Sequence, residues 1–149
     1  MAAQAAHPQR LGDSAWPEVE QNVTLLVPVG ATEQHGPHLP LDVDTVIATT
    51  VCAEVAVQLG AGAQVAPAIA YGSSGEHQDF PGTVSIGTEA LAHTLIELGR
   101  SARQWAARIV FVNAHGGNVD ALTSAVATLQ NEGTDAAWHP CRHGDVHAG

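Results

Sequence analysis

The residues of this chain best suited to chemistry lie in one short segment, GATEQHGPHLPLDVD, at positions 30–44. It concentrates imidazole and carboxylate side chains: Glu33, His35, His38, Asp42 and Asp44. Glu33 and His35 are two positions apart, so in an extended chain their side chains point the same way. Imidazole nitrogens and carboxylate oxygens are ligands that Zn²⁺, Mn²⁺ and Fe²⁺ accept. The segment therefore predicts a metal site; the alternative is a solvated polar loop in which Asp44 caps the following helix.

A second segment, NAHGGN at positions 113–118, follows another apolar run and contains His115. A single histidine is rarely a ligand, but this one should reach the sheet edge that carries Glu33 and His35. The alternative is a phosphate-binding turn at a helix N-terminus. A phosphate site would not need a histidine, and acidic neighbours would repel its ligand, so we favour His115 as a metal ligand.

A third segment, positions 71–87, contains Ser74, Glu76 and His77. The trio suggests a serine nucleophile, but the G-x-S-x-G turn between strand and helix is absent. We expect these side chains, together with His38, to contact the substrate or support the metal ligands; ordinary structural hydrogen bonding is the alternative. The His-rich C-terminal segment is a further candidate site, in which only His147 is favoured for a function.

The elements that must position these residues alternate between strand and helix. Apolar runs predict strands at 23–29, 64–70, 109–112 and 135–138, the second at an edge or bulged because of Pro67. Helical spacing predicts helices at 44–59, 88–102 and 119–132, the first ended by Gly60 and the last capped by Asn118. This order predicts an α/β fold, a parallel sheet with helices on both faces. In such folds the ligand site lies at the carboxyl ends of the strands.

Length and composition fit one domain over residues 1–149, with residues 1–20 partly disordered. Acidic residues outnumber basic ones 15 to 5, and the net charge of −10 argues against nucleic acid or an anionic membrane surface as a partner. We find no apolar run near the roughly 18 residues needed to cross a bilayer, and no signal peptide. The two cysteines form no CxxC pair, and Cys52 falls in a core-like helical pattern. We expect a cytoplasmic protein with reduced thiols.

Four segments, in order, resemble the signatures of the creatininase family: PVGATEQHGPHLPLDVD, YGSSGEHQDFPGT, NAHGGN and GDVHAG. The resemblance implies a three-layer αβα sandwich and metal-dependent hydrolysis of C–N bonds. By position, Glu33, His35, Asp44 and His115 match the family's metal ligands, and Asp44 matches the carboxylate that bridges two metals. His147 matches a histidine that shuttles protons. The family also implies a homo-oligomer.

Two positions depart from the family pattern. Creatininase itself has a metal-binding glutamate two residues after the histidine of the third motif, where this chain has Gly117. The family's HAG motif is followed by a Glu-Thr-Ser stretch, whereas this sequence stops at Gly149, so we expect the C-terminal part of the domain to be missing.

The residues of the motifs are most similar to the branch encoded with mycofactocin biosynthesis. That branch is implied to be a peptidase that releases a C-terminal dipeptide from a precursor peptide.

The sequence therefore suggests metal-assisted hydrolysis of an amide bond, with one or two ions of zinc, iron or manganese per subunit. A divalent ion lowers the pKa of water from about 15.7 to about 7, Glu33 takes part in catalysis, and His147 donates a proton to the departing nitrogen. The substrate is a small peptide or, alternatively, a creatinine-type cyclic amide. Two further alternatives are a phosphate-binding module and a metal-binding protein without catalytic activity.

Overall fold

The parallel sheet predicted from the sequence is the centre of the molecule. The computed structural model describes residues 8–142, and in this part of the chain the strands are β1 (Thr24–Val29), β2 (Ala63–Val65), β3 (Arg108–Asn113) and β4 (Ala136–Pro140). All pair in parallel, in the order β2-β1-β3-β4. The chain passes from β1 to β2 on one side of β1 and then returns to form β3 on the other side. The order in which strands are added to the sheet therefore reverses between β1 and β3. Ligand sites of open α/β sheets lie at such a switch point.

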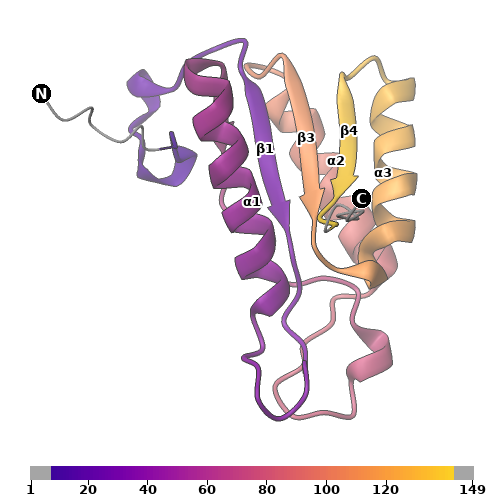
Figure 1. Cartoon of the computed structure of the whole chain (residues 1–149). Helices are drawn as coiled ribbons and strands as arrows, with labels where there is room; N and C mark the ends of the chain where they lie inside the picture. Colours follow the sequence, from indigo (N-terminus) through magenta and orange to yellow (C-terminus); the bar gives the residue numbers. More distant parts are fainter. Residues whose placement is uncertain (1–7, 143–149) are drawn as a thin grey trace, which may run out of the picture.

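Helices cover both faces of the sheet, as expected for a sandwich of three layers (Figure 1). α1 (Val43–Leu59) lies on one face, and α2 (Thr88–Ala102) and α3 (Val119–Asn131) lie side by side on the other. Alternate residues of β1 face opposite layers: Leu25 and Val27 belong to the core under α2 and α3, whereas Leu26 packs with Cys52 of α1. The α/β fold with a parallel sheet is therefore confirmed.

The second predicted strand is shorter than expected. It spans Ala63–Val65 rather than positions 64–70, and only a single bridge, between Ile69 and Val29, continues the pairing. Pro67 explains the difference, because proline has no backbone N–H for the strand ladder. β2 is an edge strand, as Pro67 predicted. Five short 3-10 turns complete the described chain, at positions 11–13, 16–18, 60–62, 75–77 and 116–118.

Asn118 occupies the N-cap position of α3, as predicted, whereas the alternative that Asp44 caps α1 does not hold. α1 begins at Val43, so Asp44 lies inside its first turn rather than at the cap, and its side chain is buried. Asn118 precedes α3 but makes no side-chain cap hydrogen bond; it bonds instead to the loops that follow β1 and precede α2. In both cases a tertiary contact takes a side chain that local sequence would assign to helix capping.

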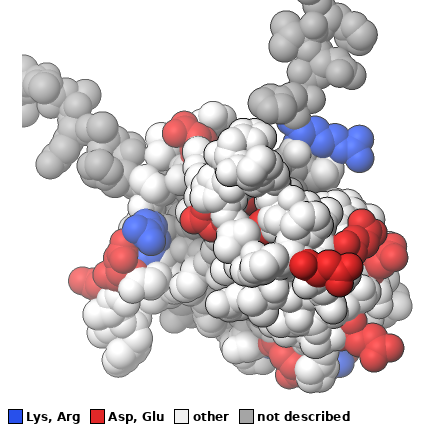
Figure 2. Space-filling model, turned by 90° about the horizontal axis from the view of Figure 1, so that it is seen from below, with Lys and Arg blue, Asp and Glu red and all other residues white. Residues whose placement is uncertain are grey.

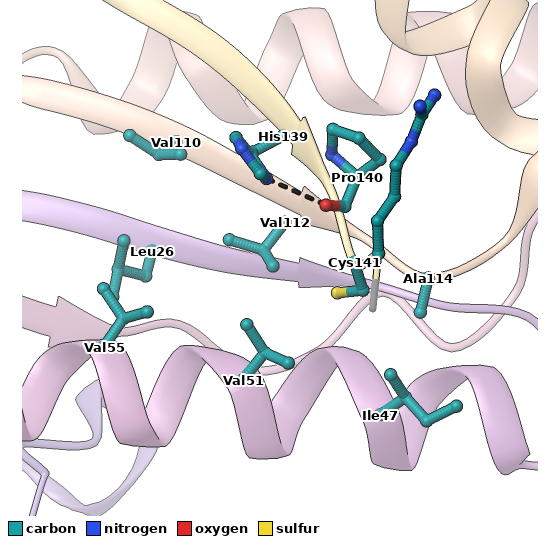
Figure 3. Close-up of a pocket in the computed structure, with 11 residues that line it drawn as sticks. Leu26, Ile47, Val51, Val55, Val110, Val112, Ala114, His139, Pro140 and Cys141 are labelled. Carbon is teal, nitrogen blue, oxygen red and sulfur yellow. Dashed lines mark hydrogen bonds between the residues drawn. The ribbon is translucent and has the colours of Figure 1, made fainter. Parts of the chain in front are cut away.

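The face of the sheet beside α1 is only partly covered. An open groove of about 610 Å³ lies between α1 and the strands β3 and β4 (Figure 3). Ile47, Val51 and Val55, one stripe of α1, form its wall, and Val110 and Val112 of β3 line it from the sheet. A parallel sheet normally has both faces buried, so the described residues leave an apolar surface available for further packing.

Helix α1 begins a segment whose composition, unlike its longest uninterrupted apolar run, would suit a membrane span. Residues Val43–Gly62 form a 20-residue segment with a mean hydropathy of 1.4, long and apolar enough by composition to cross a membrane. Scattered Thr, Asp, Glu and Gln residues interrupt the segment, so the sequence shows no continuous apolar run. In the structure the helix packs on β1 and β2 and buries Ala48, Cys52 and Ala56. Length and composition alone are weak evidence for a membrane span.

Cys52 is a core residue, as predicted. Its side chain is completely buried, and burial followed by the nearby Cys141 raises the pKa of its thiol to about 12. Burial also raises the pKa of Cys141, and both thiols are free. Because the thiolate is the reactive form, neither cysteine has the lowered pKa of a catalytic nucleophile.

Candidate metal centre

The predicted metal ligands meet at the carboxyl ends of β1 and β3, where the chain changes direction. Glu33 and His35 lie in the loop after β1, and Asp44 lies in the first turn of α1. Gly30 allows this approach, because a Cβ at that position would lie 2.6 Å from the backbone nitrogen of Thr45. Only glycine therefore lets the start of α1 pack against the end of β1.

Glu33, His35 and Asp44 form one cluster, in which one ligand atom from each residue lies within 4.8 Å of the others. Nε2 of His35 is 3.0 Å from Oδ1 of Asp44 and 3.9 Å from Oε1 of Glu33. Both carboxylates are buried, with relative exposures of 4% for Glu33 and 5% for Asp44. Buried carboxylates require partners, because transferring an unpaired charge out of water is costly.

His115 reaches the same carboxylates from β3. Its Nδ1 lies 3.2 Å from Oε1 of Glu33 and 3.1 Å from Oδ2 of Asp44. The two carboxylate oxygens of Asp44 thus face two different imidazoles, Oδ1 toward His35 and Oδ2 toward His115. Asp44 could thus be shared between two cations, as the family resemblance implies. Four side chains from separate parts of the sequence converge, as the motifs predicted.

Backbone carbonyls fix which nitrogen of each ring is free to bind. Nε2 of His115 lies 2.9 Å from the carbonyl oxygen of Ser73, and Nδ1 of His35 lies 3.1 Å from the carbonyl oxygen of Glu33. A carbonyl oxygen only accepts, so these nitrogens carry the N–H. In the neutral rings the lone pairs are then on Nδ1 of His115 and Nε2 of His35, which face the carboxylates. Outer contacts of this kind orient metal-binding histidines.

The donor atoms fit a divalent cation. Lone pairs of two imidazoles face carboxylate oxygens at 3.0–3.2 Å, an unfavourable arrangement of acceptor against acceptor unless positive charge lies between them. Oδ2 of Asp44 lies near Nδ1 of His115 but accepts no hydrogen bond from it. Oε2 of Glu33 is likewise buried without a hydrogen-bond partner. Nitrogen and oxygen donors of this kind suit zinc or manganese.

Without a metal, a proton can supply part of this charge. Burial of the ring works to lower the pKa of His115, but the nearby Asp44 carboxylate, the hydrogen bond to the Ser73 carbonyl and the charge of Glu33 hold that pKa above its ordinary value. The site therefore attracts positive charge.

Basic side chains do not neutralise the cluster. The sequence has no lysine, and within residues 8–142 the arginine ion pairs all involve acidic residues other than Glu33 and Asp44. Figure 2 looks onto the loop end of the molecule, where acidic side chains are spread over the face and the basic ones lie toward its margin. A cation from solution is thus the available partner for the two buried carboxylates.

Two asparagines that the sequence analysis did not count among the site residues hold the loop of His115. Asn113 accepts a hydrogen bond from the His115 backbone N–H at 3.2 Å and donates one to its carbonyl at 2.8 Å. Asn118 is fully buried, donates to the Gly30 carbonyl and accepts from the Ser73 backbone N–H. These bonds tie the loops after β1 and β3 to the one before α2. The NAHGGN pattern contained both residues, but sequence alone suggested a helix cap.

The other predicted site residues divide into two groups. Ser74 is buried with its hydroxyl 3.5 Å from Nε2 of His115, and Nε2 of His77 lies 3.8 Å from Oε2 of Glu33, so both adjoin the cluster. Glu76 and His38 are exposed, and neither has a recorded hydrogen bond or ion pair with the cluster residues. His147 lies outside the described residues.

Gly117 occupies the position at which creatininase has its additional glutamate. A Cβ there would lie 2.3 Å from the Ser73 carbonyl oxygen and 2.6 Å from Nε2 of His115. No side chain fits without moving the backbone around His115. The absence of a ligand at this position is thus built into the loop.

Comparisons with known proteins agree with this geometry. The model of the family described as "Creatininase: Creatinine amidohydrolase" matches residues 12–149. The "Mycofactocin precursor peptide peptidase" of Mycolicibacterium smegmatis is 58% identical over 151 residues, covering 97% of this chain and 61% of the relative. The protein of the same name from Mycobacterium tuberculosis is 60% identical over 136 residues, covering 85% of this chain and 54% of the relative. The "Creatinine amidohydrolase" of Pseudomonas putida is 36% identical, covering 83% of this chain and 52% of the relative. The chain spans about six-tenths or less of the length of these relatives.

Solved structures show the same fold. A crystal structure of creatinine amidohydrolase (creatininase) is 32% identical, has a TM-score of 0.72, and is matched over 89% of this chain and 57% of its own. A structure called "Creatininase Mn" is 33% identical with a TM-score of 0.72 and the same coverage. A mutant creatininase of "Zn-Zn type" has a TM-score of 0.71 at 33% identity, covering 88% of this chain and 56% of its own. The fold, the motifs and the family match agree: the chain belongs to the creatininase family.

Proposed function

We propose that this chain carries the metal-binding residues of a metal-dependent amide hydrolase that acts on a peptide. The supporting observation is the pair of imidazole lone pairs that face Glu33 and Asp44 at 3.0–3.2 Å. Glu33, His35, Asp44 and His115 would hold one or two divalent ions, with Asp44 shared between them. When bound, a divalent cation supplies Lewis acidity and lowers the pKa of water from about 15.7 to about 7.

The residues of the chain itself have three tasks in this proposal. Glu33 and Asp44 hold negative charge at a buried position and keep the two imidazoles oriented. Ser74, beside Nε2 of His115, can hydrogen-bond to a substrate group that approaches the cluster. His147 is proposed to donate the proton that the departing nitrogen requires, a role that general acid catalysis assigns to a nearby imidazole.

Two observations favour a peptide over a cyclic amide as the substrate. The relatives named for the mycofactocin precursor peptide are 58–60% identical, whereas the creatinine amidohydrolase is 36% identical. Gly117 also leaves no space for the additional glutamate of creatininase. We therefore propose cleavage of the C-terminal dipeptide from the mycofactocin precursor peptide.

Metal content tests the ligand assignment. Glu33→Gln and His115→Ala are each expected to lower the molar ratio of zinc or manganese to protein after dialysis, because each removes a donor from a four-residue site. Glu54→Gln and His93→Ala change the same residue types at exposed positions of α1 and α2 and should retain the metal of the unchanged protein. Equal metal content in all five proteins would refute the assignment.

Substrate choice is tested with a chromatographic assay. The metal-loaded protein should release the C-terminal dipeptide from a peptide ending in valine and tyrosine, and a chelator should stop the release. Creatinine, offered under the same conditions, should remain intact. Conversion of creatinine without cleavage of the peptide would overturn the proposed substrate class and leave the metal site in place.

Other expectations stay predictions. These are the identity of the ion, iron included, the cytoplasmic location and a homo-oligomeric state. The open apolar groove beside α1 supports the last, because a neighbouring subunit could cover its exposed apolar side chains.

A further inference from the structure

Three histidines adjoin the two buried carboxylates, but their rings are not set in the same way. His35 and His115 use their N–H groups on backbone carbonyls and turn lone pairs to the cluster. We propose that Gln34 is a positioning residue for His77: it places the N–H of the His77 ring, rather than its lone pair, toward the cluster. His77 then serves as a hydrogen-bond donor to Glu33 rather than as a metal ligand. The inference rests on the proposed function only in taking Glu33 as a ligand.

The orientation of the Gln34 amide follows from its own contacts. The backbone N–H of Gly36 donates to Oε1 of Gln34 at 2.9 Å. A backbone N–H can only donate, so the atom that faces it must be the amide oxygen, because the flipped amide would set two donors against each other. The nitrogen Nε2 of Gln34 is therefore the atom that lies 3.0 Å from Nδ1 of His77.

This contact decides the tautomer of His77. The amide nitrogen of Gln34 only donates, so Nδ1 of His77 must accept, and the proton of the neutral ring is on Nε2. That Nε2 lies 3.8 Å from Oε2 of Glu33, a buried oxygen without a hydrogen-bond partner. A hydrogen bond is about 2.7–3.2 Å long, so an approach of roughly 1 Å completes it.

The surrounding loops hold both partners in place. The backbone N–H of Gln34 donates to the hydroxyl of Thr83 at 3.1 Å, and that of His77 donates to the carbonyl of Ser74 at 3.0 Å. The ring of Phe80 lies beside His77 with the centroids 6.4 Å apart. Gln34 and His77 come from different loops, so their contact links the segment after β1 to the one before α2.

The two oxygens of the Glu33 carboxylate would therefore have different partners. Oε1 faces Nδ1 of His115 at 3.2 Å, on the side where a cation is expected, and Oε2 faces the N–H of His77. A hydrogen bond to the second oxygen fixes the plane of a metal-binding carboxylate. A His77 with its lone pair toward Glu33 would instead compete for the cation.

The tautomer can be measured directly by long-range proton–nitrogen NMR of the histidine rings in the 149-residue protein, without metal and with zinc. The His77 signals are assigned by their loss in His77→Ala. We expect the proton on Nε2 in the unchanged protein. In Gln34→Glu the carboxylate can only accept, so the proton should move to Nδ1. Gln78→Glu adds the same charge next to His77, at an exposed position, and should leave the tautomer unchanged.

Several results would overturn the inference. They are a proton on Nδ1 or on both nitrogens in the unchanged protein, or the same His77 spectrum in Gln34→Glu. If Gln34→Glu does not fold, Gln34→Leu decides: without the amide, His77 should populate both tautomers, and an unchanged spectrum contradicts the role of Gln34.

Zinc binding separates donor from ligand. His77→Ala should retain the zinc stoichiometry and weaken the affinity about 10–100-fold, as the loss of an outer contact does, whereas His35→Ala should lower the stoichiometry. Loss of an ion in His77→Ala would make His77 a ligand and refute the inference. If the unchanged protein binds no zinc, the proposed function fails, while the NMR result still decides the role of Gln34.

Discussion

Asp44→Asn is expected to abolish tight metal binding while leaving the fold intact. Asp44 contributes one oxygen toward His35 at 3.0 Å and the other toward His115 at 3.1 Å. Asparagine keeps the shape but has one acceptor oxygen and no charge. Loss of an outer contact alone weakens metal affinity about 10–100-fold, so loss of this shared carboxylate should exceed about 100-fold. Hydrolysis of the peptide should fall by a similar factor or more.

Stability measurements separate this effect from misfolding. At a metal concentration of 100 times the dissociation constant, binding stabilises the folded state by about 2.7 kcal/mol. A 100-fold weaker variant gains only about 0.4 kcal/mol at the same concentration. In chelator, Asp44→Asn should be close in stability to the unchanged protein, because the amide NH₂ can donate to an imidazole lone pair where Oδ2 of Asp44 had no hydrogen-bond partner, and this gain offsets the lost charge at the helix N-terminus.

Asp120→Asn is the matched control. Asp120 is the second residue of α3, as Asp44 is of α1, but it is exposed. Both substitutions remove a carboxylate that favours the helix N-terminus, worth about 0.3–1 kcal/mol. Only the change at Asp44 should remove the metal-dependent rise in melting temperature. A rise of normal size in Asp44→Asn would contradict the assignment of Asp44 as a ligand.

Gly117→Glu is expected to damage the site rather than convert it to that of creatininase. A Cβ at this position overlaps the Ser73 carbonyl oxygen at 2.3 Å and Nε2 of His115 at 2.6 Å. Backbone must therefore move, and overpacking of this kind costs about 1–3 kcal/mol or more. The movement also breaks the hydrogen bond between His115 and Ser73, so metal affinity should fall by about 10–100-fold.

The neighbouring glycine provides the control. A Cβ at Gly116 meets no atom within 4 Å, so Gly116→Glu adds the same side chain in open space. Chemical denaturation and zinc titration should give nearly unchanged values for Gly116→Glu. Gly117→Ala should reproduce most of the loss of stability without adding a carboxylate. A stable Gly117→Glu protein that binds an additional ion and hydrolyses creatinine would show that the loop yields, contrary to this prediction.

The order of strands and helices could be predicted from the sequence alone, because each type of element has its own apolar period. β1, β3 and α2 follow runs of buried residues that need no tertiary information, and the parallel sheet follows from their alternation. The same reasoning placed the segments of Glu33 and His115 at one sheet edge, because parallel strands end together. The convergence of these segments could thus be expected from residue type and topology, and the resemblance to the creatininase family singled out Glu33, His35, Asp44 and His115 as the proposed ligands.

Tertiary structure decided what each polar side chain does within that edge. Asp44 and Asn118 suited helix caps locally, but in the fold Asp44 faces the imidazoles of His35 and His115, and Asn118 donates to the Gly30 carbonyl. Gln34 determines which nitrogen of His77 carries the proton, and the Ser73 carbonyl determines it for His115. The contact of Gln34 with His77 joins residues 43 positions apart and that of His115 with Ser73 residues 42 apart, so no local period encodes which nitrogen of a ring meets which partner. Hydrogen-bond direction is a property of the assembled loops, and it emerges only when they are packed together.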